Sequence, residues 1–169
     1  RGDWPGIAAF AEDNIAKDKL NAAWWMVAGY AYSRQGLHVR AVERYQEVVR
    51  LDPNVAEGYT LLAQEYRATG APRRAVALLT NAQHAVRESP NLFFLLGESH
   101  ADLGQPGEAA QAYQQAVQLH AQFDEAWAGL GMSYARLGRV SEARGIAKSL
   151  TPHRPDLAAR VEQVIATQR

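Results

Sequence analysis

Glycine recurs at a fixed interval of 34 residues, and this period limits the possible folds more than any other feature of the chain. The four glycines are Gly36, Gly70, Gly104 and Gly138. A constant period of this length indicates a stack of similar units, each of which buries its apolar face against its neighbours. A stack offers an extended surface rather than a closed pocket, so we expect the chain to hold other molecules rather than transform them.

Each 34-residue unit is predicted to be a pair of helices. Apolar residues recur three or four positions apart, which is the period of a helix with one buried face. Glycine adopts the left-handed conformation that commonly ends a helix, so we interpret the four glycines as helix stops. Pro72 and Pro106 stand two residues after their glycines, and proline is favoured in the first turn of a helix. The predicted unit is therefore helix, short turn, helix.

The positions around each glycine carry the same kinds of residue in every unit. Eleven residues before the glycine there is an aromatic side chain, in Trp25, Tyr59, Phe93 and Trp127. Seven before it the residue is small, in Gly29, Ala63, Gly97 and Gly131, and five after it stand Ala41, Ala75, Ala109 and Ala143. Bulkier residues interleave with these, at Leu62, Leu96 and Leu130 and at Tyr32, Tyr66, His100 and Tyr134. Small residues at fixed positions predict helix axes that approach closely.

This pattern over residues 22–155 resembles the tetratricopeptide repeat family. The resemblance implies an all-α fold, a right-handed α-solenoid of antiparallel helix pairs with units at 22–55, 56–89, 90–123 and 124–155. The later positions of the pattern fit less closely, and they hold Tyr45, Leu79, Tyr113 and Ala147, then Val48, Ala82, Ala116 and Leu150, then Pro53, Arg87, Ala121 and Pro155. Arg87 and Ala121 replace the family's closing proline, so we expect Pro90 to stop the second repeat. Ala147 and Leu150 predict less regular packing in the last repeat.

Both ends of the chain are predicted to carry a single helix. Residues 156–169 are interpreted as a closing helix, with Asp156 as the N-cap and an apolar stripe of Leu157, Val161, Val164 and Ile165. This helix should cover apolar surface that the last repeat would otherwise expose. Residues 1–21 contain a helical pattern from Pro5 to about Lys17, with Ile7, Phe10, Ala11 and Ile15 at helical spacing. This segment is either an N-terminal cap or a degenerate second helix from a longer array.

In the tetratricopeptide repeat family, the first helices line a concave groove with the residues ten, six and three positions before the glycine. By that resemblance the groove is lined by Met26, Tyr30, Ser33, Thr60, Gln64, Arg67, Phe94, Glu98, Ala101, Ala128, Met132 and Ala135. Methionine and aromatic side chains in a groove suit a partner helix or extended segment. The alternative is that Tyr30, Phe94 and Met132 only pack against their own neighbours.

One activity of the family can be tested on the sequence. Members that grip the carboxylate tails of heat-shock chaperones place Lys, Asn and Arg at defined groove positions. The matching positions here are Met26, Tyr30, Leu61, Asn91 and Leu95. A free carboxylate needs charge-assisted donors before it leaves water, so we do not expect that binding mode.

The charges balance in number but are segregated along the chain. Eighteen basic residues match eighteen acidic ones, so bulk charge predicts no binding to nucleic acid or to an anionic membrane. Between Arg87 and Arg136 there is no Lys or Arg, but there are six acids, at Glu88, Glu98, Asp102, Glu108, Asp124 and Glu125. This acidic band between basic stretches favours a partner of matching polarity or a second copy of the chain. Solvated helix faces without a partner are the alternative.

The sequence predicts neither an enzyme nor a metal or cofactor site. There is no cysteine, and the histidines lack a metal-binding pattern. His120 and Asp124 form the nearest approach to a pair of ligands, which we interpret as polar residues at a helix end. His100 occupies a position held by tyrosine in other repeats and is expected to be half-buried.

We therefore predict a protein–protein interaction module that binds a peptide or helix of a partner in the groove, as an adaptor or scaffold. The alternatives are a self-associating structural scaffold and the recruiting arm of a larger enzyme or envelope-assembly protein. No apolar run approaches the ~20 residues of a membrane span. Because the chain opens with Arg1 rather than Met, we expect a processed protein or a piece of a longer one. The sequence is compatible with the cytoplasm or the periplasm.

Overall fold

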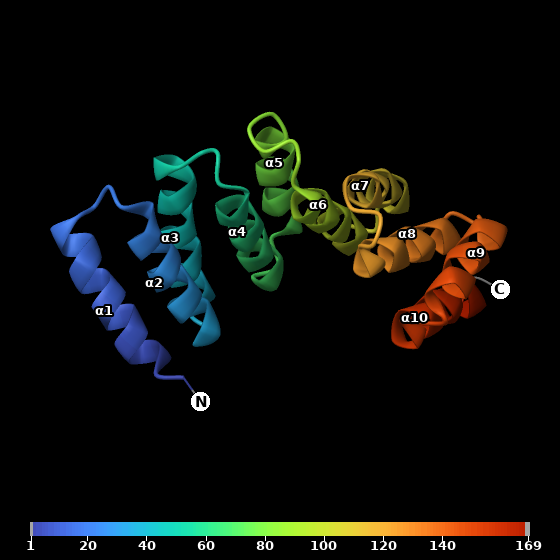
Figure 1. Cartoon of the computed structure of the whole chain (residues 1–169), viewed down its shortest axis with the longest axis horizontal. Coiled ribbons are helices and arrows are strands. Elements are labelled where there is room, and N and C mark those ends of the chain that lie inside the picture. The colour runs from blue at the N-terminus through green and yellow to red at the C-terminus, as the bar shows by residue number, and fades with distance from the viewer. Residues whose placement is uncertain (1, 168–169) are drawn as a thin grey trace. The chain divides into compact units, whose positions relative to one another are not determined.

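The computed structural model describes residues 2–167, and these residues form ten α-helices and no strand. The helices are α1 (Trp4–Lys17), α2 (Ala22–Arg34), α3 (His38–Leu51), α4 (Ala56–Ala68), α5 (Pro72–Ala82), α6 (Pro90–Asp102), α7 (Pro106–Leu119), α8 (Asp124–Arg136), α9 (Val140–Leu150) and α10 (Pro155–Thr167). They divide into two compact units, one with α1–α5 that ends at Arg87 and one with α6–α10 that begins at Glu88 (Figure 1).

Consecutive helices pack as pairs within each unit. Helix α2 packs against α3 and α4 against α5 in the first unit, and α6 packs against α7 and α8 against α9 in the second. The turn between the two helices of a pair is short, so the helices run antiparallel. The predicted all-α fold of antiparallel helix pairs is confirmed. The division of the chain into four repeats stays a prediction.

The four periodic glycines end the first helix of each pair, as predicted. They are the described glycines with a left-handed backbone, and their φ angles run from +68° at Gly104 to +76° at Gly138. In each case the residue after the glycine donates its N–H to the carbonyl of the residue four positions before the glycine. In the first pair Leu37 N lies 2.9 Å from Tyr32 O, and in the second Ala71 N lies 2.7 Å from Tyr66 O. This hydrogen bond satisfies a carbonyl that the end of the helix would leave unpaired.

Four of the described helices begin at a proline. Pro72 and Pro106 are the first residues of α5 and α7, which confirms their predicted role. The expectation that Pro90 stops the second repeat is wrong, because α5 ends at Ala82 and Pro90 is the first residue of α6. The Ser89 hydroxyl accepts a hydrogen bond from Leu92 N at 3.2 Å and caps this helix. Proline fits the next position because the N–H that it lacks would have no partner in the helix.

Small residues on the first helices make room for bulky residues on the second. In the second unit the Tyr113 ring of α7 lies between Gly97 of α6 and Gly129 of α8. A β-carbon at Gly97 would lie 2.7 Å from this ring, and one at Gly129 would lie 2.5 Å from it. The alanine five positions after each periodic glycine is fully buried, at Ala41, Ala75, Ala109 and Ala143. These contacts explain the small residues that the sequence repeats.

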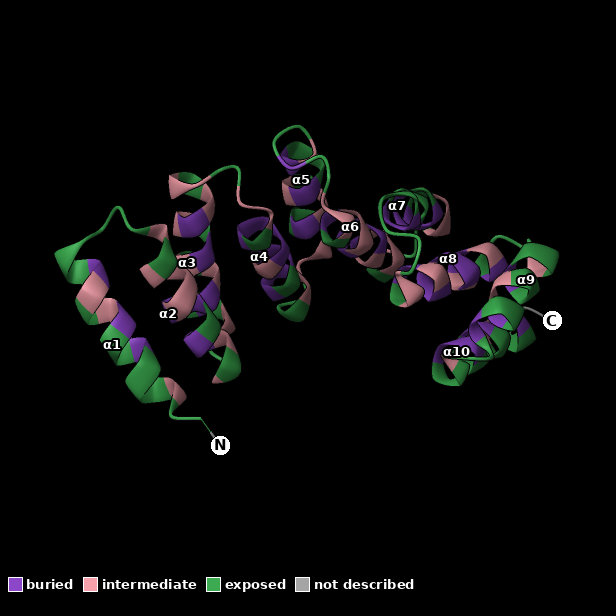
Figure 2. Cartoon of the chain, in the orientation of Figure 1, coloured by how far each residue is buried: buried purple, intermediate pink, exposed green. Residues whose placement is uncertain are grey.

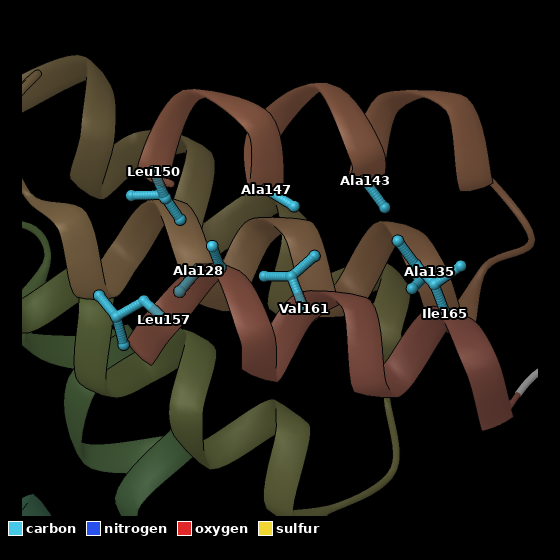
Figure 3. Close-up of a cluster of buried hydrophobic side chains, with 9 residues drawn as sticks. Ala128, Ala135, Ala143, Ala147, Leu150, Leu157, Val161 and Ile165 are labelled. Atoms are coloured by element: carbon cyan, nitrogen blue, oxygen red, sulfur yellow. The ribbon is translucent and has the colours of Figure 1, made fainter. Parts of the chain in front are cut away.

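Helix α10 covers one side of α8 and α9, as a closing helix should. Leu157, Val161 and Ile165 point into a buried cluster with α8 and α9, and Val164 packs at its edge (Figure 3). The predicted N-cap is two positions too late, because α10 begins at Pro155 and Arg154 precedes it. Asp156 lies in the first turn, after Pro155, and its carboxylate accepts hydrogen bonds from the Arg154 guanidinium.

Helix α1 lies alongside α2 and buries one side of its surface there. Ala8, Ala11 and Ile15 are buried, while Ile7 and Phe10 are exposed. Figure 2 shows buried and exposed stretches alternating along α1. Glu12 fixes α1 to the following pair because its carboxylate accepts hydrogen bonds from the Tyr32 hydroxyl and the Arg44 guanidinium. Helix α1 therefore belongs to the first unit.

Candidate functional site

The predicted groove residues form two sets, one in each unit. We call the first face the set on α2 and α4, which contains Met26, Tyr30, Ser33, Thr60, Gln64 and Arg67. We call the second face the set on α6 and α8, which contains Phe94, Glu98, Ala101, Ala128, Met132 and Ala135. Within each helix the three positions are four and three residues apart and so share one side of the helix.

The first face presents an exposed aromatic side chain. Tyr30 keeps 46% of its surface exposed, and its ring meets the Trp4 ring edge-on at 5.7 Å. Gln64 is exposed as well, while Met26, Ser33 and Arg67 are half-buried. Thr60 is buried and its hydroxyl donates a hydrogen bond to Glu57 O at 2.9 Å, which corrects its assignment to the groove surface. The exposed residues of this face are therefore Tyr30 and Gln64, and Met26 lies half-buried on α2 one turn before Tyr30.

A buried carboxylate ties the helices of the first face together. Glu65 on α4 is 5% exposed. Its Oε1 accepts a hydrogen bond from Ser33 Oγ of α2 at 2.5 Å, and its Oε2 lies 2.7 Å from His38 Nδ1 of α3. These bonds link α2, α3 and α4 at one point. A buried carboxylate is tolerated only when its oxygens are paired in this way.

Sequence reasoning missed Glu65, although a signal for it was present. In the other three repeats its position holds a small, buried residue, at Ala31, Ser99 and Ser133. A charged residue at a position that is otherwise small indicates a specific partner in the core. The serines at this position bond only within their own helix, since Ser99 Oγ donates to Leu95 O and Ser133 Oγ to Gly129 O.

Tyr45 lies beneath the first face, with a buried hydroxyl. Its side chain packs against Gly29 of α2, where a β-carbon would lie 2.6 Å from the ring. Among the described residues, no group forms a hydrogen bond with its Oη. Burial is the main reason why the pKa of Tyr45 is raised well above its ordinary value, and the charge of Glu65 adds to the effect. Tyr45 therefore stays neutral at physiological pH.

The second face is more closely packed into its own unit. The Phe94 ring lies 4.9 Å from the Phe123 ring and 5.9 Å from the Tyr113 ring. Glu98 accepts a hydrogen bond from the Tyr113 hydroxyl at 2.6 Å. Ala101 and Met132 are half-buried and pack at the edges of the apolar clusters. Phe94 and Met132 thus pack against neighbouring residues of their own unit over a large part of their surface, as the alternative interpretation expected.

Two residues of the second face are corrected by the structure. Ala128 is 1% exposed and Ala135 is fully buried. Both belong to the cluster that α8, α9 and α10 enclose, and Figure 3 shows them beside Val161 and Ile165. They cannot line a groove because α10 packs over this side of α8, where a partner would have to bind.

Many charges of the acidic and basic stretches find partners within their own unit. Arg154 lies 2.7 Å from Glu125 and 3.1 Å from Asp156, and Arg44 lies 2.7 Å from Glu12. The hydrogen bond from Arg154 lowers the pKa of Glu125 below its ordinary value. Binding of a partner through these charge bands stays a prediction.

The histidines do not assemble a metal site in the described residues. Asp124 lies 3.2 Å from Nε2 of His153, in place of a pairing with His120. Within residues 2–167 no three His, Cys, Asp or Glu side chains come together as metal ligands would. His100 is half-buried, and its Nδ1 lies 2.8 Å from Gln105 Oε1. In that same part of the chain, no helix has the length and apolar character needed to cross a bilayer.

The chain is similar to one curated protein in sequence and to several solved structures in fold. Protein bimA of Emericella nidulans (strain FGSC A4) is 25% identical over 114 residues, which are 68% of this chain and 14% of bimA. The chain thus spans 14% of the length of that relative. The crystal structure of MamA is 23% identical with a TM-score of 0.80, over 98% of this chain and 92% of MamA. YrrB, described as a TPR protein with an unusual peptide-binding site, is 25% identical with a TM-score of 0.75, over 94% of this chain and 83% of its own.

Family models agree with these similarities along nearly the whole chain. One tetratricopeptide repeat model matches residues 6–56 and 60–123, and a second matches residues 100–166. The fold that they describe is that of a protein–protein interaction module. The repeated helix pairs, their glycine stops and these matches show that the chain belongs to the tetratricopeptide repeat family.

Proposed function

We propose that this chain is an adaptor that binds a peptide or helix of another protein on the first face. The observation that carries the proposal is the exposed ring of Tyr30, which stands beside Met26 on α2. An aromatic side chain of this size buries a large apolar area on binding and loses little conformational entropy. Gln64 on α4 adds an amide that both donates and accepts hydrogen bonds, which suits a peptide backbone.

The framework beneath the first face supports this function. The Glu65 carboxylate holds α2 through Ser33 and α3 through His38, so the helices that carry Tyr30 and Gln64 are tied together before a partner arrives. A surface that is organised in advance loses less freedom on binding and gains affinity. The chain acts in this proposal by binding alone, without a cofactor.

The similarity to YrrB supports the same conclusion. That protein has a peptide-binding site, and it shares the fold over 94% of this chain. The second face is a weaker candidate, because α10 covers Ala128 and Ala135 and because Phe94 packs against Tyr113 and Phe123. We therefore assign the main contact to Tyr30, Met26 and Gln64.

A peptide selection tests the proposal. Peptides selected from a random displayed library are labelled, and their affinity is measured by fluorescence anisotropy. We expect Tyr30→Ala to weaken binding about tenfold or more, since exposed aromatic residues dominate such interfaces. Gln64→Ala should weaken binding by a smaller factor. Val39→Ala is the matched control, because Val39 on α3 is a large apolar residue with 70% exposure outside the first face.

Backbone amide shifts on peptide addition locate the bound peptide. The proposal predicts the largest shifts at Met26, Tyr30 and Gln64. A library that yields no binder overturns the proposal, and so does a set of binders whose affinity for Tyr30→Ala equals that for the wild type. Circular dichroism of each variant separates loss of binding from loss of folding.

A further inference from the structure

Arg44 of α3 lies over two aromatic rings of α2 in the first unit. Its guanidinium carbon lies 5.6 Å from the centre of the Trp25 ring and 5.7 Å from the centre of the Tyr32 ring. A carboxylate holds it there, because Arg44 Nε donates to Glu12 Oε1 of α1 at 2.7 Å. Both α1 and α3 pack against α2. The ion pair of Arg44 and Glu12 therefore bridges the two helices that pack against α2.

The same four positions recur around α8, three periods of 34 residues later. They hold Gln114, Trp127, Tyr134 and Ile146 in place of Glu12, Trp25, Tyr32 and Arg44. The two rings are kept, and both indole N–H groups donate to the carbonyl six residues earlier, at 3.0 Å for Trp25 and 2.8 Å for Trp127. Neither member of the ion pair is kept. The bridge between α1 and α3 is thus absent from the corresponding helices α7 and α9.

A cavity stands where the corresponding ion pair would lie. Its volume is about 490 Å³, which is within the range of ligand-binding pockets. Gln114, Trp127, Tyr134 and Ile146 all line it, and we call it the α8 cavity. No Lys or Arg is among the described residues that line it. The arginine that fills this place in the first unit therefore has no counterpart in the α8 cavity.

Gly145 of α9 keeps the α8 cavity open. It lines the cavity, and a β-carbon at this position would meet no atom within 4 Å. The corresponding positions of the other three repeats hold Glu43, Ala77 and Gln111. Glycine weakens the interior of a helix, and packing within the chain does not require it here. The space that Gly145 leaves is therefore available to a partner.

The lining of the α8 cavity suits a cation. Glu142 lines it, and its side chain keeps 49% of its surface exposed beside its ion pair with Arg139. A second cavity of about 530 Å³ adjoins at Trp127, which lines both, and Asp124 lines this second cavity. Neither cavity is lined by a Lys or Arg of the described chain, so their charge is complementary to a basic partner. Arg139 lies over the Tyr134 ring at 3.9 Å, so this ring already accepts a guanidinium.

We propose that the α8 cavity binds an arginine of a partner protein, in a segment with apolar residues beside that arginine. The guanidinium takes the place that the arginine holds in the first unit, against the rings of Trp127 and Tyr134, and pairs with Glu142. Arginine is preferred to lysine because its planar group stacks on aromatic rings and binds a carboxylate through two N–H groups. The apolar neighbours contact Leu130 and Ile146, which line the same cavity. This site lies in the second unit and does not include the first face.

Two displayed heptapeptide libraries test the proposal on the whole chain. One library has arginine at its central position and the other has glutamine there, and the remaining positions are random. We expect only the arginine library to yield peptides that shift the NMR resonance of the Trp127 indole N–H. Citrulline has nearly the shape of arginine but no charge. Replacing the arginine of a selected peptide with citrulline should weaken binding about tenfold, as measured by fluorescence anisotropy.

Substitutions in the chain test the position of the bound arginine. Gly145→Trp fills the α8 cavity and should abolish binding of the selected peptides. Gly107→Trp is the matched control, because Gly107 of α7 also has no atom within 4 Å of its β-carbon and lines neither cavity. The double variant Gln114→Glu with Ile146→Arg restores the ion pair of the first unit and should weaken binding about tenfold or more, since the chain then fills the cavity itself.

Circular dichroism identifies the variants that remain folded. An arginine library without binders overturns the proposal. Selected peptides that bind equally well with citrulline also overturn it, as do peptides that bind the folded Gly145→Trp chain or the folded double variant as tightly as the wild type.

Discussion

The contact of Tyr113 with two glycines predicts that adding one methyl group destabilises the second unit. In Gly129→Ala the new β-carbon would lie 2.5 Å from the ring carbon Cζ of Tyr113 and 2.6 Å from Cε1. These distances are far shorter than the ~3.5 Å of a carbon–carbon contact. The ring has little room to move. It is 1% exposed, its hydroxyl is bound to Glu98, and Phe94 packs beside it.

Two effects of opposite sign determine how much Gly129→Ala changes the free energy of unfolding. Alanine is favoured over glycine within a helix by about 0.8–1 kcal/mol. Overpacking of a close-packed core costs about 1–3 kcal/mol, and more where nothing can shift. We expect the steric cost to win at Gly129, with a net loss of about 1–2 kcal/mol in the free energy of unfolding. Gly145→Ala in α9 is the matched control, because its β-carbon would meet no atom within 4 Å. In Gly145→Ala only the preference of alanine over glycine within a helix remains, so the free energy of unfolding should rise by up to about 1 kcal/mol.

Urea unfolding followed by far-ultraviolet circular dichroism measures both changes. The midpoint should fall in Gly129→Ala and rise in Gly145→Ala. Replacing the ring as well, in the double variant with Tyr113→Leu, should remove most of the cost of the Gly129 substitution, because the two residues are in contact. If Gly129→Ala stabilises the chain as much as Gly145→Ala, the close approach of α7 and α8 is refuted.

Three further predictions concern the turns, the buried carboxylate and the ion pairs. Gly104→Ala should cost about 1 kcal/mol in thermal unfolding through its positive φ alone, since no atom lies near its β-carbon; an unchanged melting temperature would contradict this. Glu65→Ala should cost about 1–3 kcal/mol in urea unfolding, because the Ser33 hydroxyl loses its acceptor. Arg154→Gln should raise the pKa of Glu125 toward its ordinary value in a carboxyl carbon NMR titration. Because this pKa is depressed in the folded chain, the stabilisation exists at neutral pH and disappears as the pH falls through the folded value.

Local geometry is the part of the fold that the sequence predicts well. The glycine stops, the helix-starting prolines and the closing helix each follow from the backbone preferences of single residues or from an apolar stripe within one segment. The errors at Pro90 and Asp156 are also local. Both residues lie in the first turn of a helix. Proline and aspartate are each favoured at several positions near a helix start, so the residue pattern locates the start of a helix only to within a few residues.

The candidate site was predicted less completely, because exposure depends on what packs against each residue. The family pattern placed both Tyr30 and Ala135 on the groove side, six and three residues before their respective glycines. Tyr30 is exposed and Ala135 is buried, since α10 packs over α8 while the corresponding side of Tyr30 stays open. The spacing of residues along the chain does not show that one of these side chains is exposed and the other buried.

The sequence by itself determined that this chain forms repeated helix pairs, because glycine, proline and apolar spacing act through the backbone of neighbouring residues. Only the tertiary structure decided which side chains remain free to bind. Glu65 pairs with Ser33 on another helix and becomes part of the framework, whereas Phe10 meets the edge of the Trp24 ring and keeps 60% of its surface exposed. Such contacts join residues far apart in the chain, and their balance of burial and exposure is set by packing rather than by local preference.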